Sequence, residues 1–514
     1  MRHLLYIFCF LTGCLFSQTT KYEATKEYFY LYGGKNFDEA RSIKELPGKQ
    51  YIIAGTTSSF GQGNTSVYLI KTDSMGNHLW SYPFGGSQND WGYSVEVTAD
   101  SSFFVAGYSN SFNPPNGYDA YYFKVDKNGN LLWQKTVSGS DWDFIYGSTP
   151  MPDGGFILCG ETYTNSYGNA DAYLIRINKN GDTLWNKHYG GALDEKFNSV
   201  YVINNRIYAV GNNLTHATDS ISDAWIMKLD TNGNFISQNF IGGIHHYGEE
   251  LKGITAYDAN TFFVCGKTDL IDSNSTQSMI ARMDTSLNFI FGPYRGGLTS
   301  TGEYVCFNQV VKTSYGNIYT IGTASGGLGG MNLFMVGFHP DLTWITGFAH
   351  DCGLQYNDYG YSGIYSSSGR VVVVGSAQQI CSTNPALGLD DAFLVRFESD
   401  SITNAGITQT ITQCFGDTLF YWAASLHNYD KGVHLNLFPN PLTEKAQLEI
   451  KCDAQTIFII GVYSVLGNEV MRFKAESNSK NEIDLSALDN GSYFLKLEDK
   501  EGKNISVLKF VKAN

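Results

Sequence analysis

The strongest constraint on the fold of this 514-residue chain is a stretch of 21 residues that recurs along most of it. Residues 171–191 read DAYLIRINKNGDTLWNKHYGG, residues 119–139 read DAYYFKVDKNGNLLWQKTVSG and residues 223–243 read DAWIMKLDTNGNFISQNFIGG. Weaker copies follow Thr65, Gln277 and Asn332. The closing glycine pairs or their equivalents are 52 to 56 positions apart, which is typical of repeated supersecondary units.

Each repeat predicts a four-stranded antiparallel sheet. Residues 171–191 contain two apolar runs that flank NKNG, in which Gly181 supplies the positive φ of a tight hairpin turn. The first half of the repeat, such as DWGYSVEVTADSSFFVAGYS from Asp90, adds two further strands. Four strands of about 5 to 6 residues and four short connections account for the period. The turn from Asp126 to Asn130 also has the oxygen-rich opening of a calcium loop, but it lacks the downstream glutamate, so turn chemistry is the favoured interpretation.

The two halves of the repeat are present in unequal numbers. Seven first halves begin at Asn36, Asn89, Ser140, Leu193, Tyr247, Thr301 and Tyr356. The last second half, from Asp390, lacks its final strand, and a strand of the missing type, residues 28–34, stands alone near the N-terminus. Pairing that strand with the last unit would close a ring and remove the exposed sheet edges. The sequence therefore predicts an all-β protein with a seven-bladed β-propeller over residues 20–403.

The N-terminus predicts export. Residues 1–17 hold one arginine and an apolar run from Leu4 to Phe16, and so resemble a secretory signal peptide. Residues 11–14, LTGC, also fit a lipobox, which would make Cys14 a lipidated N-terminus. Cleavage near Ser17 is favoured because Leu15 and Phe16 extend the apolar core. No other run of 18 apolar residues occurs, so we expect a mature chain that is not an integral membrane protein.

Charge and cysteine content argue against several classes of function. A formal net charge of −14 disfavours nucleic acid and anionic lipid as partners, since both need clustered Lys and Arg. Cys159 and Cys265 occupy one strand position in two repeats, where small buried residues are expected. Cys352, Cys381 and Cys414 gather around the last repeat, and one disulfide among them, of open pairing, would suit an oxidising compartment. Neither CxxC nor HExxH spacing occurs, so we predict no metal site and no cofactor.

The candidate binding residues lie where one repeat joins the next. Each junction carries acidic and aromatic residues, and the connection between the second and third strands of each repeat is long and variable. In an up-and-down sheet these connections share one face with the junctions, and variable loops on a rigid ring commonly form sites. The loops would also vary if nothing constrained them. We predict a face that binds a glycan or a protein, formed by Asp90, Trp91, Asp141, Trp142, Asp143 and Tyr247.

The same acids raise an alternative function. Two carboxyl groups about 5 to 9 Å apart could serve a glycoside hydrolase. A catalytic pair should break the symmetry of a ring, whereas these acids recur, so hydrogen bonding between neighbouring blades is the favoured interpretation. No G-x-S-x-G motif occurs, and the ten histidines are scattered. We therefore expect a binding module, with an extracellular carbohydrate-active enzyme as the alternative.

Over residues 28–399 the repeats resemble the bacterial propeller repeats known as SBBP-type repeats. The shared features are an acidic-Gly-Tyr opening, a V-x-G strand end, a DAF or DAY strand and an LW…GG strand. The resemblance implies a propeller on an exported protein and carries no activity with it.

A different pattern follows the repeats. Residues 404–433 keep no repeat register and are predicted to be a linker. From residue 434, short strands separated by turns extend over about 80 residues, a length and pattern typical of a small β-sandwich. We expect residues 434–514 to form a separate immunoglobulin-like domain.

This last segment resembles the type A C-terminal sorting domain of the type IX secretion system in Bacteroidetes. The resemblance is carried by FPNP at 438–441, VY to LG at 462–467, IDL to GSYF at 483–494 and KFVK at 509–512. It implies recognition by the type IX machinery, then removal of the domain as the protein is attached to the cell surface or released. Prolines at 439 and 441 would fix an edge strand, and the basic strand is either a recognition strand or an ordinary solvated edge. The candidate signal residues are Pro439, Asn440, Pro441, Gly467, Gly491, Tyr493, Lys509 and Lys512.

Overall fold

The computed structural model describes residues 28–34, 36–112, 117–216, 222–242, 247–270, 275–296, 304–325, 330–351, 357–378, 390–398, 408–410, 434–438, 445–451, 456–464, 469–488, 491–498 and 504–512. The regular elements in these ranges are β-strands. Within the same ranges, no helix has the length and apolar character of a membrane span. The predictions that lie outside them concern the signal peptide with Cys14, Cys352, Cys381, Cys414, Pro439, Asn440, Pro441 and Gly467.

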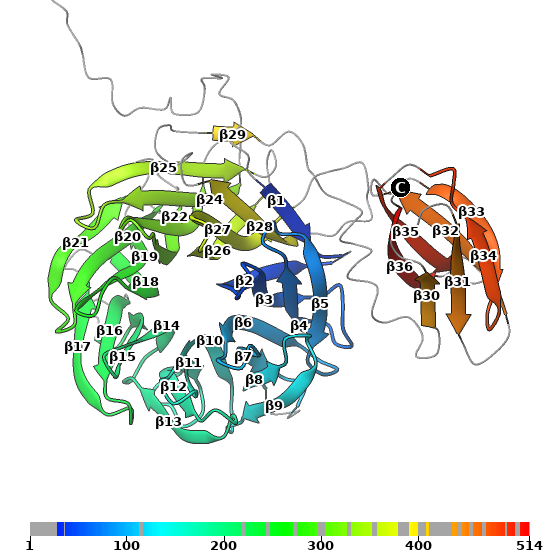
Figure 1. Cartoon of the computed structure of the whole chain (residues 1–514). Coiled ribbons are helices and arrows are strands. Elements are labelled where there is room, and N and C mark those ends of the chain that lie inside the picture. Colours follow the sequence, from blue (N-terminus) through cyan, green and yellow to red (C-terminus); the bar gives the residue numbers. More distant parts are fainter. Residues whose placement is uncertain are drawn as a thin grey trace, which may run out of the picture.

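The described strands before residue 434 form seven sheets of one design. In each sheet four antiparallel strands follow one another from the centre of the ring outwards (Figure 1). We number these sheets as blades in chain order. Blade 1 consists of β2 (Asp38–Glu45), β3 (Tyr51–Thr57), β4 (Ser66–Thr72) and β5 (His78–Phe84). Blade 2 consists of β6 (Asp90–Val97), β7 (Phe103–Ser109), β8 (Asp119–Val125) and β9 (Leu131–Val137). Blade 3 consists of β10 (Asp143–Pro150), β11 (Phe156–Thr162), β12 (Asp171–Ile177) and β13 (Thr183–Tyr189). Blade 4 consists of β14 (Glu195–Ile203), β15 (Arg206–Asn213), β16 (Asp223–Leu229) and β17 (Phe235–Ile241). Blade 5 consists of β18 (Tyr247–Ala256), β19 (Thr261–Leu270), β20 (Ser275–Asp284) and β21 (Phe289–Gly296).

The last two blades depart from simple chain order. Blade 6 consists of β22 (Val305–Lys312), β23 (Ile318–Ser325), β24 (Met331–Phe338) and β25 (Trp344–Asp351), and the short β29 (Thr408–Thr410) pairs in parallel with its outer edge. Blade 7 contains β26 (Asp358–Tyr365), β27 (Arg370–Ala377) and β28 (Asp391–Glu398), and its outer strand is β1 (Tyr28–Tyr32) from the other end of the chain. The predictions of an all-β propeller and of an N-terminal strand that completes the last blade are confirmed.

The ring closes through both backbone and side chains of β1. Its five residues pair with β28 from Tyr28 opposite Arg396 to Tyr32 opposite Ala392. The Tyr32 side chain is 1% exposed, and its hydroxyl donates a hydrogen bond of 2.6 Å to the carbonyl oxygen of Gly76 in blade 1. Tyr32 therefore fastens blade 7 to blade 1 as well as completing its own sheet.

Hydrophobic cores lie between neighbouring blades rather than inside single sheets. One core joins Phe104 and Tyr122 of blade 2 to Phe156 and Ile175 of blade 3, and the Phe104 and Phe156 rings stack with centroids 3.9 Å apart. Burying an aromatic side chain of this size contributes about 1.5–3 kcal/mol. Cys159 is buried in another such core, as predicted. Each blade therefore buries its apolar side chains against both neighbouring blades, and the ring is stable only as a whole.

The predicted hairpin turns close the third and fourth strands. In the turn after β8, Asp126 accepts hydrogen bonds from the backbone N–H groups of Asn128 and Asn130 at 2.8 and 2.9 Å, and Gly129 has φ of +87°. The carboxylate is thus engaged by the backbone of its own turn, as the turn interpretation requires. In blade 5 the positive φ falls instead on Leu287, which shows that the turn geometry persists without glycine.

The C-terminal strands form a smaller body with two sheets (Figure 1). One sheet contains β30 (His434–Phe438), β31 (Lys445–Lys451) and β34 (Lys480–Asp484). The other contains β33 (Glu469–Glu476), β32 (Ile457–Ser464), β35 (Gly491–Glu498) and β36 (Asn504–Lys512). Leu448 from the first sheet and Ile460 and Leu495 from the second share one core, so the two sheets pack face to face.

Removal of β1 tests ring closure. We expect a chain that begins at residue 35 to lose at least about 3 kcal/mol of unfolding free energy, the cost of removing one fully buried aromatic side chain. A chain that begins at residue 25 keeps β1 and serves as the matched control. Urea unfolding followed by circular dichroism measures both, and equal midpoints would contradict closure through β1.

Candidate functional site

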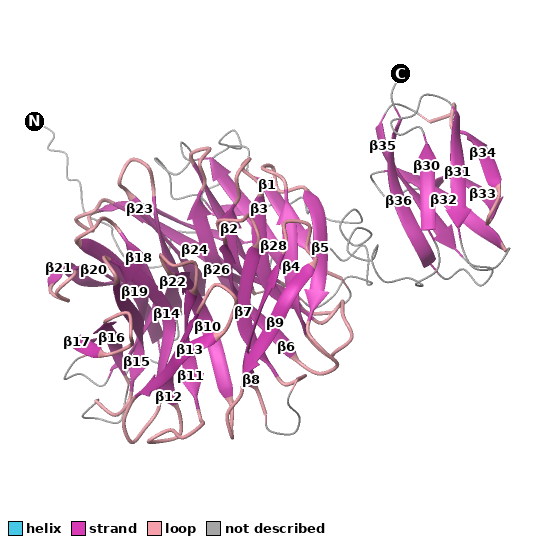
Figure 2. Cartoon of the chain, turned by 60° about the horizontal axis from the view of Figure 1, so that its bottom comes forward, coloured by secondary structure: helices cyan, strands magenta, loops and turns pink. Residues whose placement is uncertain are grey.

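The ring has two faces with different loops. The hairpin turns after the first strand of every blade, and after the third strand of blades 1 to 6, lie on one face of the ring. The described parts of the connections after the second and fourth strands lie on the other face, which we call the loop face (Figure 2). Hydrogen bonds join the two kinds of connection there: the Asn110 N–H donates to the Asn89 carbonyl at 3.0 Å, and the Tyr163 N–H donates to the Trp142 carbonyl at 2.8 Å. These bonds confirm the prediction that the connections within a blade and the junctions between blades share one face.

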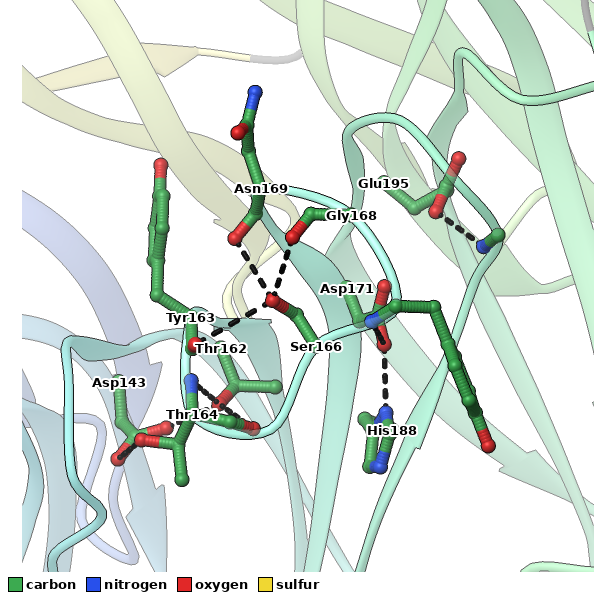
Figure 3. Close-up of polar contacts among 12 residues, drawn as sticks. Asp143, Thr162, Tyr163, Thr164, Ser166, Gly168, Asn169, Asp171, His188 and Glu195 are labelled. Carbon is green, nitrogen blue, oxygen red and sulfur yellow. Dashed lines mark hydrogen bonds and ion pairs between the residues drawn. The ribbon is translucent and has the colours of Figure 1, made fainter.

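A buried carboxylate begins the inner strand of most blades. Asp90 accepts hydrogen bonds from the Gly86 N–H at 2.8 Å and from the hydroxyls of Ser109 and Ser111. It therefore ties the connection arriving from blade 1 to the second strand and following loop of blade 2. Asp143 binds the hydroxyls of Thr162 and Thr164 in the same manner (Figure 3). The equivalent residues are Asp38, Asp90, Asp143, Glu195, Glu249 and Asp358, with Val305 at this position in blade 6.

These contacts change the role of two predicted site residues. Asp90 and Asp143 are buried, with exposed fractions of 0% and 2%. Their carboxylate oxygens accept hydrogen bonds from donors within the protein. Hydrogen bonding across the blade junction thus accounts for them, as the favoured interpretation held. Neither side chain presents a free carboxylate on the loop face.

The residue that follows this position in each blade faces a residue of the second strand. We call these seven cross-strand pairs the rim pairs. Directly opposed residues in a sheet hold their side chains on the same face, so each pair acts as a unit. The rim pairs are Glu39 with Thr56, Trp91 with Tyr108, Phe144 with Glu161, Lys196 with Asn212, Glu250 with Lys267, Cys306 with Thr323, and Tyr359 with Ser376.

The rim pairs of blades 2 and 3 belong to a continuous group of aromatic side chains. Trp91 stacks on Tyr108 with centroids 6.1 Å apart, and Tyr108 meets the Phe144 ring edge-on at 4.8 Å. Trp142 lies 6.0 Å from both Phe144 and Tyr163. Trp142 is 47% exposed and the other rings are half-buried. We call this group the aromatic patch: Trp91, Tyr93, Tyr108, Tyr118, Trp142, Phe144, Tyr146 and Tyr163.

In blades 1 to 3, a β-bulge places a further residue of the inner strand in or beside the patch. Tyr93 and Tyr146 are the bulged residues of blades 2 and 3, and their rings meet at 5.4 Å. In blade 1 the bulged residue is Arg41, whose guanidinium lies 5.2 Å from the Tyr93 ring and 3.8 Å from the Tyr361 ring. Arg41 also forms an ion pair of 2.7 Å with the buried Glu39. Bulges of this kind re-aim side chains at binding sites.

Charged side chains take the same positions in blades 4 and 5. Lys196 and Lys252 contact Glu250 at 2.9 and 2.8 Å, and Lys267 contacts Asp269 at 2.6 Å. Burial by itself raises the pKa of Glu250, but the two lysines hold it well below its usual value. Equivalent positions therefore differ in chemistry around the ring, with aromatic rings in blades 2 and 3 and paired charges in blades 4 and 5.

The loop after β11 adds polar contacts but no nucleophile with its base. The Ser166 hydroxyl lies 2.9 and 3.0 Å from the carbonyl oxygens of Gly168 and Asn169, while His188 Nδ1 pairs with Asp171 at 2.6 Å (Figure 3). Activation of a serine needs a base in hydrogen-bond reach, and Ser166 is directed to the backbone instead. Among the residues that the structure describes, no group of three His, Cys, Asp or Glu side chains could hold a metal ion.

The predicted site residues thus separate into three kinds. Trp91 and Trp142 belong to the aromatic patch, and Asp141 is exposed beside Trp142. Asp90 and Asp143 are buried in the blade junctions. Tyr247 begins β18, and its side chain lies outside the described ones. The sequence argument missed the other patch residues, although an alignment of the repeats in strand register would have brought Tyr108 and Phe144 beside Trp91.

The predicted signal residues of the C-terminal domain are structural where their side chains are described. Tyr493 lies in the core between the two sheets. Lys512 is buried, and its ammonium group donates hydrogen bonds to the carbonyl oxygens of Leu485, Ser486 and Leu488 at 3.0, 2.9 and 2.5 Å. Gly491 and Lys509 are paired within the sheet of β35 and β36. Lys512 therefore fastens the last strand to the turn after β34.

Substitution of the buried lysine tests this role. We expect Lys512→Met to cost about 1–3 kcal/mol, because it leaves carbonyl oxygens without their donor. Amide hydrogen exchange of residues 504–512 in the intact chain should become faster. Lys445→Met, which removes an exposed ion pair with Glu482, serves as the control. Unchanged exchange in the Lys512 variant would show that its ammonium group is not needed for packing.

Titration of the junction carboxylates gives a second test. Burial raises the pKa of Asp143 to about 6, although hydrogen bonds from Thr162 and Thr164 oppose the shift. The folded state therefore binds this proton more tightly than the unfolded chain, so the unfolding free energy should rise as pH falls from about 7 to about 4.

We expect Asp143→Asn to flatten this rise in thermal unfolding. Asp126→Asn is the control, because the hydrogen bonds that this exposed turn residue accepts from Asn130 lower its pKa, and its carboxylate stays ionised in that window. An Asp143→Asn variant with the full rise would assign the dependence to other groups.

Comparisons with known proteins match two parts of the chain. Residues 436–512 match the family described as the secretion system C-terminal sorting domain. The regulatory protein FlaEY of Caulobacter vibrioides is 23% identical over 412 residues, which cover 71% of this chain and 40% of that protein. The chain thus spans about two fifths of this relative's length.

Two solved structures are similar to this chain at low TM-scores. One is PorZ, a surface component of the type IX secretion system of Porphyromonas gingivalis, with 12% identity, a TM-score of 0.39, and coverage of 93% of this chain and 60% of that one. The other is the WD40 domain of Pan2 from Neurospora crassa, with 9% identity, a TM-score of 0.42, and coverage of 72% and 95%. The architecture of the present chain follows from its own sheet order. A sorting domain directs secretion, followed by attachment to the cell surface or release. The chain is a β-propeller protein that carries, at its C-terminus, a sorting domain of the type IX secretion system.

Proposed function

We propose that this protein is an exported binding module whose propeller holds a ligand at the aromatic patch, and whose C-terminal domain engages the type IX secretion machinery. The observation that carries the proposal is the position of the patch. Five of its residues, Trp91, Tyr93, Tyr108, Phe144 and Tyr146, occupy rim-pair and bulge positions that hold polar or charged side chains in blades 4 and 5. The fold tolerates both kinds of residue there, so the concentration of aromatic rings in blades 2 and 3 has a cause other than the fold.

The accessibility of the patch supports the same proposal. Trp142 keeps 47% of its surface exposed although its ring lies edge-on to the rings of Tyr118, Phe144 and Tyr163, with centroids 6.0 to 6.1 Å apart. Gly117 has φ of +104° and lies under this ring, where any Cβ would collide with it. A tryptophan that is held firmly and remains open is typical of a binding anchor.

The alternative of a carbohydrate-active enzyme has less support. A catalytic carboxyl pair must face the substrate, yet Asp90 and Asp143 are buried and each is engaged by hydroxyl donors. Their equivalents recur in most blades, which is the behaviour of a structural element. The asymmetry of the ring lies in its aromatic residues rather than in an isolated carboxylate cluster, and this favours binding.

Arrays of immobilised glycans and proteins would test the proposed function. For any ligand so found, Trp91→Ala with Trp142→Ala should weaken binding by at least tenfold, about 1.4 kcal/mol. The single variant Trp142→Ala keeps the half-buried Trp91, so weaker binding by this variant does not arise from lost packing of Trp91. The matched control is Tyr315→Ala, which removes an 84% exposed ring from the turn between β22 and β23 on the opposite face. Full affinity in both tryptophan variants, with unchanged unfolding curves, would place the site elsewhere.

A further inference from the structure

We infer that the ligand of the aromatic patch is a neutral glycan chain, an inference that rests on the proposed function and names its ligand class. A pyranose ring presents an apolar face of C–H groups and a rim of hydroxyl groups. Its recognition therefore needs aromatic faces next to hydrogen-bonding side chains. The patch and its surroundings offer both.

The aromatic part of this requirement is met by rings set at different angles. Trp91 and Tyr108 lie nearly parallel, with 25° between their planes, whereas Phe144 stands at 87° to Tyr108 and Trp142 at 81° to Phe144. Surfaces at several angles can contact successive sugar units of a chain that turns at each linkage. The rings also keep their places without a ligand, because each is packed against at least one other ring. Little side-chain entropy is then lost on binding.

The polar part is supplied by groups that border the same rings. The Tyr93 and Tyr108 hydroxyl oxygens are 3.4 Å apart, and Asn89 donates to the Tyr118 hydroxyl at 3.4 Å. Both distances are long for hydrogen bonds involving a hydroxyl, so a ligand hydroxyl can compete for these groups. Glu161, the rim partner of Phe144, accepts a hydrogen bond of 2.6 Å from Tyr146 and keeps a second carboxylate oxygen. Carboxylate oxygens are strong acceptors for sugar hydroxyls.

The charge around the patch selects against acidic glycans. Arg41, Lys196, Lys252 and Lys267 are the cations at rim or bulge positions of the described blades, and each contacts a carboxylate within 2.9 Å. A uronate or sulfate group would have to compete with these carboxylates. The whole chain adds a formal charge of −14, which repels polyanions at long range. A neutral glycan meets neither obstacle.

A protein ligand is less suited to the same surface. A standard protein interface covers about 800 Å² on each partner and needs a broad exposed apolar centre. In the patch only Trp142 is strongly exposed, and the remaining rings are half-buried. The accessible area is therefore divided among ring faces and edges, which suits a narrow ligand such as a glycan chain.

Titration of the full-length chain with defined polysaccharides tests the inference. The neutral probes are soluble β-1,3-glucan, β-1,4-glucan oligomers, xylan, mannan, galactan and dextran, and the acidic probes are polygalacturonate and alginate. Calorimetry and tryptophan fluorescence should detect at least one neutral probe and neither acidic probe. Trp142→Ala should weaken that binding by about tenfold and Glu161→Gln by a few-fold, whereas Tyr315→Ala should leave it unchanged. Raising NaCl from about 0.05 to about 0.5 M should have little effect, since no ion pair forms with the ligand.

Three results would overturn the inference. The first is binding to the acidic probes alone, or neutral-probe binding that weakens steeply with salt. The second is neutral-probe binding that survives in the Trp142→Ala variant. The third is no binding to any neutral probe. If a protein on the array then still depends on Trp142, the proposed function stands and only its ligand class is wrong; if nothing depends on Trp142, both fail together.

Discussion

The pairing of β1 with β28 is the contact on which the rest of the structure depends. A four-stranded sheet of this composition has apolar side chains on both faces, and each face must be covered by another sheet. Neighbouring blades do this for one another, as the shared core of Phe104, Tyr122, Phe156 and Ile175 illustrates. A ring satisfies every blade only if its ends meet, and β1 provides the meeting point by supplying a strand and the Tyr32 contact to Gly76.

A closed ring also fixes the geometry of the loop face. Buried carboxylates such as Asp90 hold the incoming connection against the next loop, and this sets the place where each inner strand begins. The rim pairs and bulges follow at constant distances along the strand. Their side chains can then vary in chemistry without changing the backbone, which is how blades 2 and 3 carry aromatic rings where blades 4 and 5 carry ion pairs. The scaffold and the candidate site are thus separable, and only the scaffold is repeated.

Much of the scaffold could be predicted from the sequence because its signals are local or repeated. The Asp126 type of turn, the four-strand unit and the orphan strand at residues 28–32 each leave a pattern in the chain. Of the aromatic patch that forms the candidate site, only Trp91 and Trp142 are among the residues that the sequence predicts, whereas Tyr108, Tyr118 and Phe144 are not. Their proximity depends on strand register and on bulges, which composition does not reveal. The burial of Asp90 and the carbonyl contacts of Lys512 likewise arise from packing between distant segments.

The central claim is that a rigid, closed ring presents one aromatic binding face. Amide hydrogen exchange of the intact chain, measured with and without a saturating neutral polysaccharide, tests it most directly. The account predicts slower exchange in residues 90–93, 108–112 and 141–146, together with unchanged exchange in the opposite turn at residues 313–317. Protection confined to that opposite turn, or spread evenly over all seven blades, would contradict the account.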